Sequence, residues 1–197
     1  MTEDRSNAIA LGALGMLSGA AAWAFVNFAS MVRGTEFTAL SVAPGLVFGL
    51  AIGLLLHHRR KVGGIRYVGY VAAAGLAYFC AYHVAFYVDQ TFFTWGFPSG
   101  EVVVGFVVSG ILAGLVGGLL LGLVTIRLLH VPARVALRWS VGVGGAAGAL
   151  LGITTHDNTE WGWTYLAFFV LWQGAYAASL APLLRQVSAS VDAGRVG

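Results

Sequence analysis

The chain has 197 residues, of which 58% are hydrophobic and only 10% are charged, and its mean hydropathy is +0.82. Soluble domains carry roughly 25% charged residues, so this composition excludes an ordinary soluble protein and predicts an integral membrane protein. The formal charge of +3 comes with no nucleic-acid-binding motif, and Cys80 is the only cysteine, which excludes an internal disulfide.

Six apolar stretches follow one another, each close to the 20 or so residues that a helix needs to cross a bilayer. We predict an all-α fold, in which residues 1–197 form one integral membrane domain, a polytopic bundle of six transmembrane helices. The first stretch follows the acidic segment MTEDRSN and is too long for a signal-peptide core, so we expect a retained helix. The predicted spans cover about residues 8–31, 39–57, 67–88, 101–126, 136–154 and 164–184.

The basic residues predict the orientation. With six spans, both termini and the loops at 57–66 and 127–138 share one side, and that side holds ten of the eleven Lys and Arg residues. The positive-inside rule makes it cytoplasmic. We expect a multi-pass protein of a bacterial or archaeal cytoplasmic membrane, with an acidic outer side. The basic residues are Arg5, Arg59, Arg60, Lys61, Arg66, Arg127, Arg134, Arg138, Arg185 and Arg195.

Small residues recur every fourth position in four of the spans. Helices in lipid gain little from hydrophobic burial against one another, so close backbone approach along such stripes holds a bundle together. We predict that the stripes are helix-packing faces, within the chain or towards a membrane protein partner. The stripes are Gly45, Gly49 and Gly53; Gly69, Ala73, Ala77, Ala81 and Ala85; Gly110, Gly114, Gly118 and Gly122; and Gly144, Gly148 and Gly152.

A weak repeat groups the spans into three hairpins. Two returning spans open with a proline and a glycine, in SVAPGLVFGLAIG and GFPSGEVVVG. Pro44 and Pro98 suit the first turn of a helix, and Ser41 and Ser99 can cap that turn. The third returning span lacks the proline, so the repeat extends over two of the three pairs.

Polar groups recur near the outer ends of the spans. His83 lies about five residues inside the third span, which a rise of 1.5 Å per residue places roughly 7 Å below the outer surface. Ionisable and amide groups inside a bilayer usually face the bundle interior or a wet cavity. We therefore predict an outward-facing polar and aromatic pocket. Its expected ligand-binding residues are Asn27, His83, Asp89, Trp95, Glu101, His156, Asp157, Glu160, Trp172 and Gln173.

Structural roles compete with this pocket. Asn27, His83 and Gln173 can each hydrogen-bond a neighbouring helix, and the aromatic residues of the outer loops can anchor the chain at the membrane interface. The loop DQTFFTWGFPSG carries four large aromatic residues, more than anchoring requires, and can also fold over the bundle mouth as a lid.

Three chemical interpretations of His83 stay open. Cys80 and His83 lie on one helix face, which is compatible with a metal. His156 is the residue that would supply a second axial ligand for haem. Ser109 lies at a similar depth and would complete a nucleophilic dyad, but Val107 stands where the Gly-x-Ser-Gly motif of rhomboid proteases has its first glycine. No motif identifies a cofactor, and an enzyme is the less favoured class.

The layout as a whole, six spans in under 200 residues with an acidic and aromatic outer side, resembles the substrate-binding subunits of energy-coupling-factor transporters. The resemblance covers the whole chain and rests on no motif. It implies that an outward pocket binds a solute and that a separate membrane partner supplies energy. The acidic outer side favours a small cationic or metal-bearing solute. The competing expectation is an accessory or assembly subunit of a larger membrane complex, and we expect no nucleic-acid partner.

Overall fold

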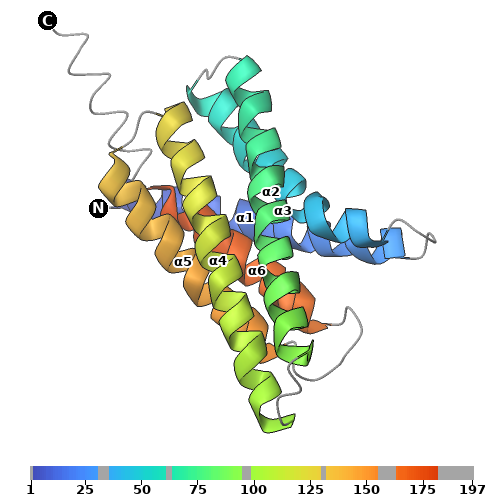
Figure 1. Ribbon diagram of the computed structural model, residues 1–197. Helices are drawn as coiled ribbons and strands as arrows, with labels where there is room; N and C mark the ends of the chain where they lie inside the picture. The colour runs from blue at the N-terminus through green and yellow to red at the C-terminus, as the bar shows by residue number, and fades with distance from the viewer. Residues whose placement is uncertain are drawn as a thin grey trace, which may run out of the picture.

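A computed structural model describes residues 2–30, 36–60, 64–94, 99–129, 132–154 and 163–181. These ranges form six α-helices and contain no strand, which confirms the all-α prediction, and each predicted span coincides with one helix (Figure 1). The helices are α1 (Thr2–Ser30), α2 (Glu36–Arg60), α3 (Gly64–Thr94), α4 (Ser99–Leu129), α5 (Ala133–Thr154) and α6 (Trp163–Ser179).

Three of the described helices are long and apolar enough to cross a membrane. The apolar segments are Ser6–Ala29 in α1, Gly64–Phe92 in α3 and Val104–Leu128 in α4, and shorter apolar segments lie at Ser41–Leu55 in α2 and Leu166–Ser179 in α6. These segments are typical of a membrane protein.

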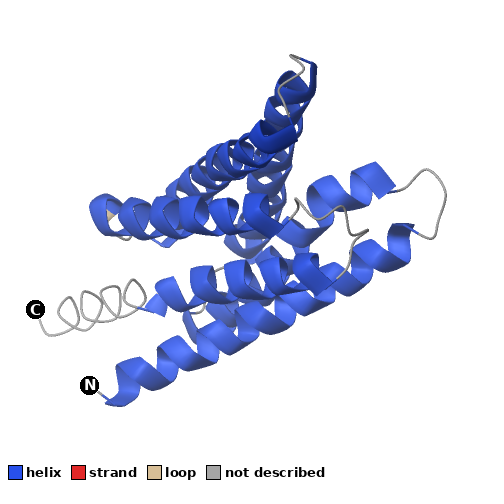
Figure 2. Cartoon of the chain, turned by 90° about the horizontal axis from the view of Figure 1, so that it is seen from below, coloured by secondary structure: helices blue, strands red, loops and turns tan. Residues whose placement is uncertain are grey.

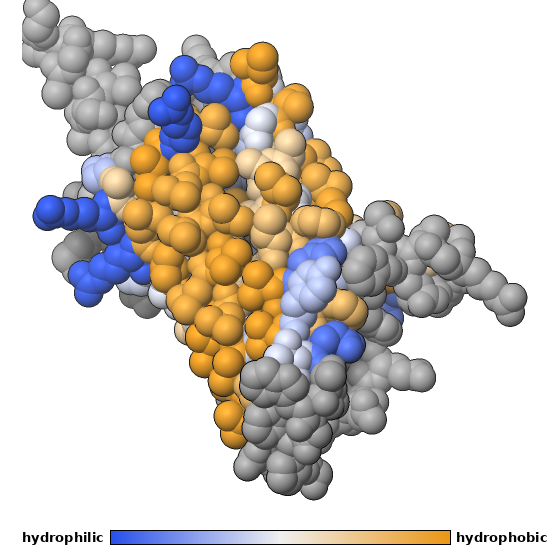
Figure 3. Space-filling view, viewed as in Figure 1, coloured by the Kyte–Doolittle hydropathy of each residue, from blue (hydrophilic) through white to orange (hydrophobic). Residues whose placement is uncertain are grey.

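Large apolar side chains also cover the outside of the helices. Leu17 is 68% exposed and Phe28 is 69% exposed, both on α1, and Leu76 on α3 is 61% exposed. Figure 3 shows a broad hydrophobic surface over α4 and α5, with a more hydrophilic strip along the C-terminal half of α3. A continuous exposed apolar surface is costly in water, whereas lipid tails cover it without cost. The surface therefore agrees with the membrane class that the composition predicts.

The six helices pack as a closed ring. Each helix contacts its neighbours along the chain, and α6 closes the ring against α1. The most extensive contact joins α4 to α5, and the next joins α1 to α6. Figures 1 and 2 show α1 and α6 in a layer behind α3 and α4. The chain ends of the described part therefore lie on neighbouring helices.

Side chains from five helices fill the centre of the ring. The most buried large side chains, each at most 2% exposed, are Phe48 and Ile52 of α2, Tyr70 of α3, Tyr176 of α6 and Leu180 directly after α6. The rings of Phe48 and Tyr176 meet edge to face, with centroids 5.6 Å apart. Smaller residues of α4 and α5 complete the same cluster. Around these residues, the centre of the helix ring is thus a packed core.

The glycine stripes of α4 and α5 pack against each other, as the sequence predicts. Here the two backbones are in contact, because a Cβ atom added to Gly114, Gly118, Gly144 or Gly148 would meet a backbone carbonyl oxygen of the other helix. Gly114 faces Gly144, Gly118 faces Ser140, and Gly148 faces Gly110.

The other stripes are partly confirmed. Gly45 and Gly49 of α2 lie directly against Ala74 and Val71 of α3. Gly69 was grouped with the packing residues of α3, but a Cβ atom there would meet nothing within 4 Å, so this glycine packs against no helix of the described chain. A further seam was not predicted. Gly12, Gly15 and Gly19 of α1 pack on α6, where Gly15 and Gly19 meet the backbone at Gln173 and Phe169.

Pro44 lies inside α2 and not at its start, so this detail of the sequence analysis is wrong. The helix begins at Glu36, eight residues before the proline. Proline removes one intrahelical hydrogen bond, and in membrane helices neighbouring groups compensate for that loss. The side chain of Gln173 in α6 contacts the backbone here, because its Nε2 donates to the Pro44 carbonyl oxygen at 3.2 Å.

Candidate functional site

Gln173, a predicted pocket residue, is fully buried and joins three helices. Its Nε2 donates to Pro44 of α2, and its Oε1 accepts a hydrogen bond from the Ser18 hydroxyl of α1. Both polar ends of the amide are therefore used inside the bundle. The structure places this residue in the helix-tying role that competed with ligand binding.

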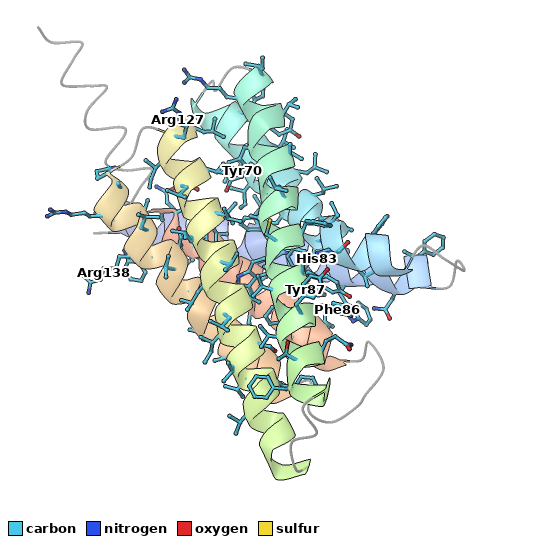
Figure 4. All side chains as sticks on the ribbon, viewed as in Figure 1. Tyr70, His83, Phe86, Tyr87, Arg127 and Arg138 are labelled. Carbon is cyan, nitrogen blue, oxygen red and sulfur yellow. The ribbon has the colours of Figure 1, made fainter. Side chains whose placement is uncertain are left out.

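Asn27 and His83 each bond to their own helix. The Nδ2 atom of Asn27 donates to the Trp23 carbonyl oxygen at 2.9 Å, and the His83 Nδ1 atom lies 2.9 Å from the Phe79 carbonyl oxygen. The imidazole stacks at a tilt on the Phe79 ring, with centroids 4.0 Å apart, and Tyr87 lies one turn beyond (Figure 4). His83 thus belongs to an aromatic strip on one side of α3.

Trp172 sits in an aromatic cluster between α2, α3 and α6. It stacks on Phe168 with centroids 5.9 Å apart, and it lies 6.4 Å from Phe48 and 5.6 Å from Tyr78. Trp172 and Tyr78 both keep part of their surface exposed. The cluster therefore has an accessible part, formed by Trp172 of α6 and Tyr78 of α3, whose rings are in contact.

Asp89, near the predicted outer end of α3, has a carboxylate oxygen that lacks a hydrogen-bond partner among the described residues. It lies within the apolar span of α3, and its Oδ1 atom is buried with no hydrogen-bond partner among the described residues. Its carboxylate faces Ser109 of α4. Ser109 is 2% exposed and donates its own hydrogen to the Phe106 carbonyl oxygen at 3.0 Å. Asp89 is therefore a partly buried acid that needs a donor or a positive charge.

Asp89 lies on the same face of α3 as two tyrosines. With 100° per residue, the positions Tyr78, Tyr82, Ala85 and Asp89 fall within about 60° of one another, whereas His83 is about 120° away from Asp89. All four are partly exposed. We call this set the inner stripe of α3. The sequence analysis missed Tyr78 and Tyr82, although the successive spacings of four, three and four residues from Tyr78 to Asp89 are the signal of a shared helix face.

A second polar group lies deeper in the ring. The Ser140 and Tyr176 hydroxyls are 2.9 Å apart, and Thr125 donates to the Leu121 carbonyl oxygen at 2.8 Å. The Tyr70 hydroxyl lies beside Thr125 but does not reach hydrogen-bond geometry with it. These side chains come from four helices and are all at most 2% exposed, so they tie the core together.

The remaining predicted site residues stay predictions. Trp95, His156, Asp157 and Glu160 lie outside the described residues. Glu101 lies in the first turn of α4, but its side chain is not among those described.

The metal and dyad interpretations gain no support from the described residues. They contain no group of three or more His, Cys, Asp and Glu side chains that could hold a metal ion. Ser109 is placed against Asp89 and bonds within its own helix, so the contact it makes across to α3 is with the carboxylate.

The chain matches no protein-family model, no curated protein and no solved structure. Function is therefore argued from the geometry of the site alone.

Proposed function

We propose that the protein is a six-span membrane protein with both termini in the cytoplasm, and that it binds a small cationic solute from the outer side as a component of transport. The observation that carries this proposal is the Asp89 carboxylate. It lies near the C-terminal end of α3, which we place on the outer side, and its Oδ1 atom is buried with no hydrogen-bond partner among the described residues.

The physical argument rests on the cost of burying charge. An ionised carboxylate in an apolar environment is strongly unfavourable unless an opposite charge or several donors compensate it. Intramembrane acids accordingly mark ion and substrate pathways more often than random positions do. The neighbouring Ser109 hydroxyl lies beside Asp89 and donates to the Phe106 carbonyl oxygen, but a neutral hydroxyl brings no positive charge to the carboxylate. A bound cation would supply the missing compensation.

A second candidate function is an accessory subunit of a larger membrane complex. Two observations favour it: the centre of the helix ring is packed, and the polar groups of Gln173 and Tyr176 hydrogen-bond to other helices. These groups stabilise the bundle and are therefore already used, not offered to a ligand. Native mass spectrometry of the purified protein separates the two candidates. A retained small cation supports solute binding, and a stoichiometric second polypeptide with no retained solute supports the accessory role.

The orientation gives the first testable prediction. In a Cys80→Ala background, Thr94→Cys should react with an impermeant thiol reagent in intact cells, because the end of α3 is placed outside. Arg60→Cys, at the end of α2 on the basic side, should react only after the cells are permeabilised. Labelling measured by gel shift in the opposite pattern would reverse the orientation and place Asp89 at the cytoplasmic side.

The second prediction concerns Asp89. In detergent, cation salts at matched ionic strength should raise the unfolding temperature of the wild type, because a ligand that binds the folded state at 100 times its Kd adds about 2.7 kcal/mol. We use potassium, magnesium and benzylammonium chlorides as probes. Asp89→Asn should lose the response while remaining folded, since a neutral amide is cheaper to bury than a carboxylate.

His83→Leu is the matched control on the same helix. It should keep the cation response, because His83 lies about 120° around α3 from Asp89. If wild type and Asp89→Asn respond identically to all three salts, Asp89 is not a cation site and the solute-binding proposal falls.

A further inference from the structure

We propose that the solute is an elongated hydrophobic organic cation, whose ammonium group binds at Asp89 and Ser109 and whose apolar body lies along Tyr82 and Tyr78 towards Trp172. This inference rests on the proposed function and adds the chemical class of the solute.

The charge of the site matches one ammonium group. Asp89 offers a single carboxylate, and its Oδ1 atom, which has no partner among the described residues, is an acceptor for one N–H bond. Ser109 lies beside the carboxylate and donates to the Phe106 carbonyl oxygen, and a hydroxyl oxygen that donates its hydrogen keeps lone pairs, so it is a second acceptor at this point. A primary ammonium carries three donors and one positive charge, and it can satisfy both oxygens at once.

The inner stripe of α3 extends the site with aromatic surface. Tyr82 and Tyr78 lie seven and eleven residues before Asp89, so their backbones are about 10 Å and 16 Å away along the helix. Tyr78 continues the surface to α6, since its ring centroid lies 5.6 Å from that of Trp172 and 6.2 Å from that of Phe169. Aromatic faces bind apolar bodies and attract a neighbouring cation.

Among the described helices, α2 packs on the stripe at Tyr78 and separates from it towards Asp89. Gly45 of α2 lies against Ala74 and the Cβ atom of Tyr78, which places α2 directly on α3 at that level. Beyond it, the N-terminal half of α2 diverges from the C-terminal half of α3 (Figure 1). Tyr78, Tyr82 and Asp89 are all partly buried. We place the entry of the solute on the side where these two helices separate.

The experiment compares matched probes on the full-length protein in detergent. Benzylammonium has the charge and a flat apolar body, benzyl alcohol has the body without the charge, and potassium has the charge without the body. Benzylammonium should raise the unfolding temperature at a concentration at least tenfold lower than the potassium concentration that gives the same rise. Benzyl alcohol should not raise it. Tyr82→Leu should weaken the benzylammonium response several-fold, whereas Tyr82→Phe, which keeps the ring, should retain it.

The outcomes separate this inference from the proposed function. If potassium or magnesium stabilises the protein through Asp89 and benzylammonium is no better, the solute is an inorganic cation, and the proposed function stands while the organic class falls. If Tyr82→Leu binds benzylammonium as tightly as the wild type does, the aromatic stripe is not part of the site. If no probe gives a response that depends on Asp89, both proposals fall.

Discussion

Gly148→Leu is expected to lower the stability of the protein in detergent by at least about 1–3 kcal/mol, the usual cost of overpacking a core. The reason is the direct contact between α4 and α5. A Cβ atom at Gly148 would meet the Gly110 carbonyl oxygen, and it would lie 2.6 Å from the carbonyl carbon. A backbone carbonyl cannot rotate away as a flexible side chain can, so the two helices must separate. Thermal unfolding of the purified variant measures the loss.

Gly142→Leu is the matched control, because it makes the same change on the same helix. A Cβ atom at Gly142 would meet nothing within 4 Å, so this variant should be as stable as the wild type to within a few tenths of a kcal/mol. Equal losses in both variants would mean that leucine destabilises α5 itself. A Gly148→Leu variant as stable as the wild type would show that α4 and α5 do not meet along this seam.

Gln173→Glu should destabilise the protein by about 3–5 kcal/mol near pH 8, the range found when a buried charge is left uncompensated. The change conserves shape, but it replaces the Nε2 donor that faces the Pro44 carbonyl oxygen with an oxygen. A protonated acid can donate to that carbonyl again. The loss relative to the wild type should therefore be smaller at pH 5 than at pH 8 in thermal unfolding experiments.

Gln173→Leu provides the comparison without a charge. It removes the hydrogen bonds to Ser18 and Pro44 but fits an apolar environment, so we expect a smaller loss, of about 0.6–1.7 kcal/mol for each interhelical hydrogen bond. Wild-type stability of Gln173→Glu at pH 8 would contradict the buried tie. It would instead place the side chain in a hydrated pocket, as the sequence analysis expects.

The sequence predicts a packing seam between helices where the seam leaves a regular spacing of small residues within one helix. The stripe Gly110, Gly114, Gly118 is visible as a spacing of four, and a glycine face has little use on a lipid-exposed helix surface. The seam of Gly12, Gly15 and Gly19 was overlooked because its spacing is irregular. Gly69 shows the opposite error, since its spacing fits a stripe but no helix lies over it.

The candidate site was less accessible to sequence reasoning. Depth along a helix suggested grouping His83 with Gln173, because both are polar residues in apolar spans. Depth does not specify direction around the helix, and Gln173 proves to face Ser18 and Pro44 inside the bundle. The link between Asp89 and Tyr82 was present as a helical spacing, but its meaning depends on which face of α3 stays uncovered by α2.

The sequence by itself determined the helices and the class of the protein. Hydropathy decides both, because an apolar segment of about 20 residues in lipid must satisfy its backbone hydrogen bonds internally and so becomes a helix. Only the tertiary structure decided which polar groups tie helices together and which keep an unused acceptor. That distinction arises from contacts between residues far apart in the chain, such as Ser18 with Gln173 and Asp89 with Ser109. A polar atom is satisfied or unsatisfied by its neighbours in space, and those neighbours are set by how the six helices close into a ring.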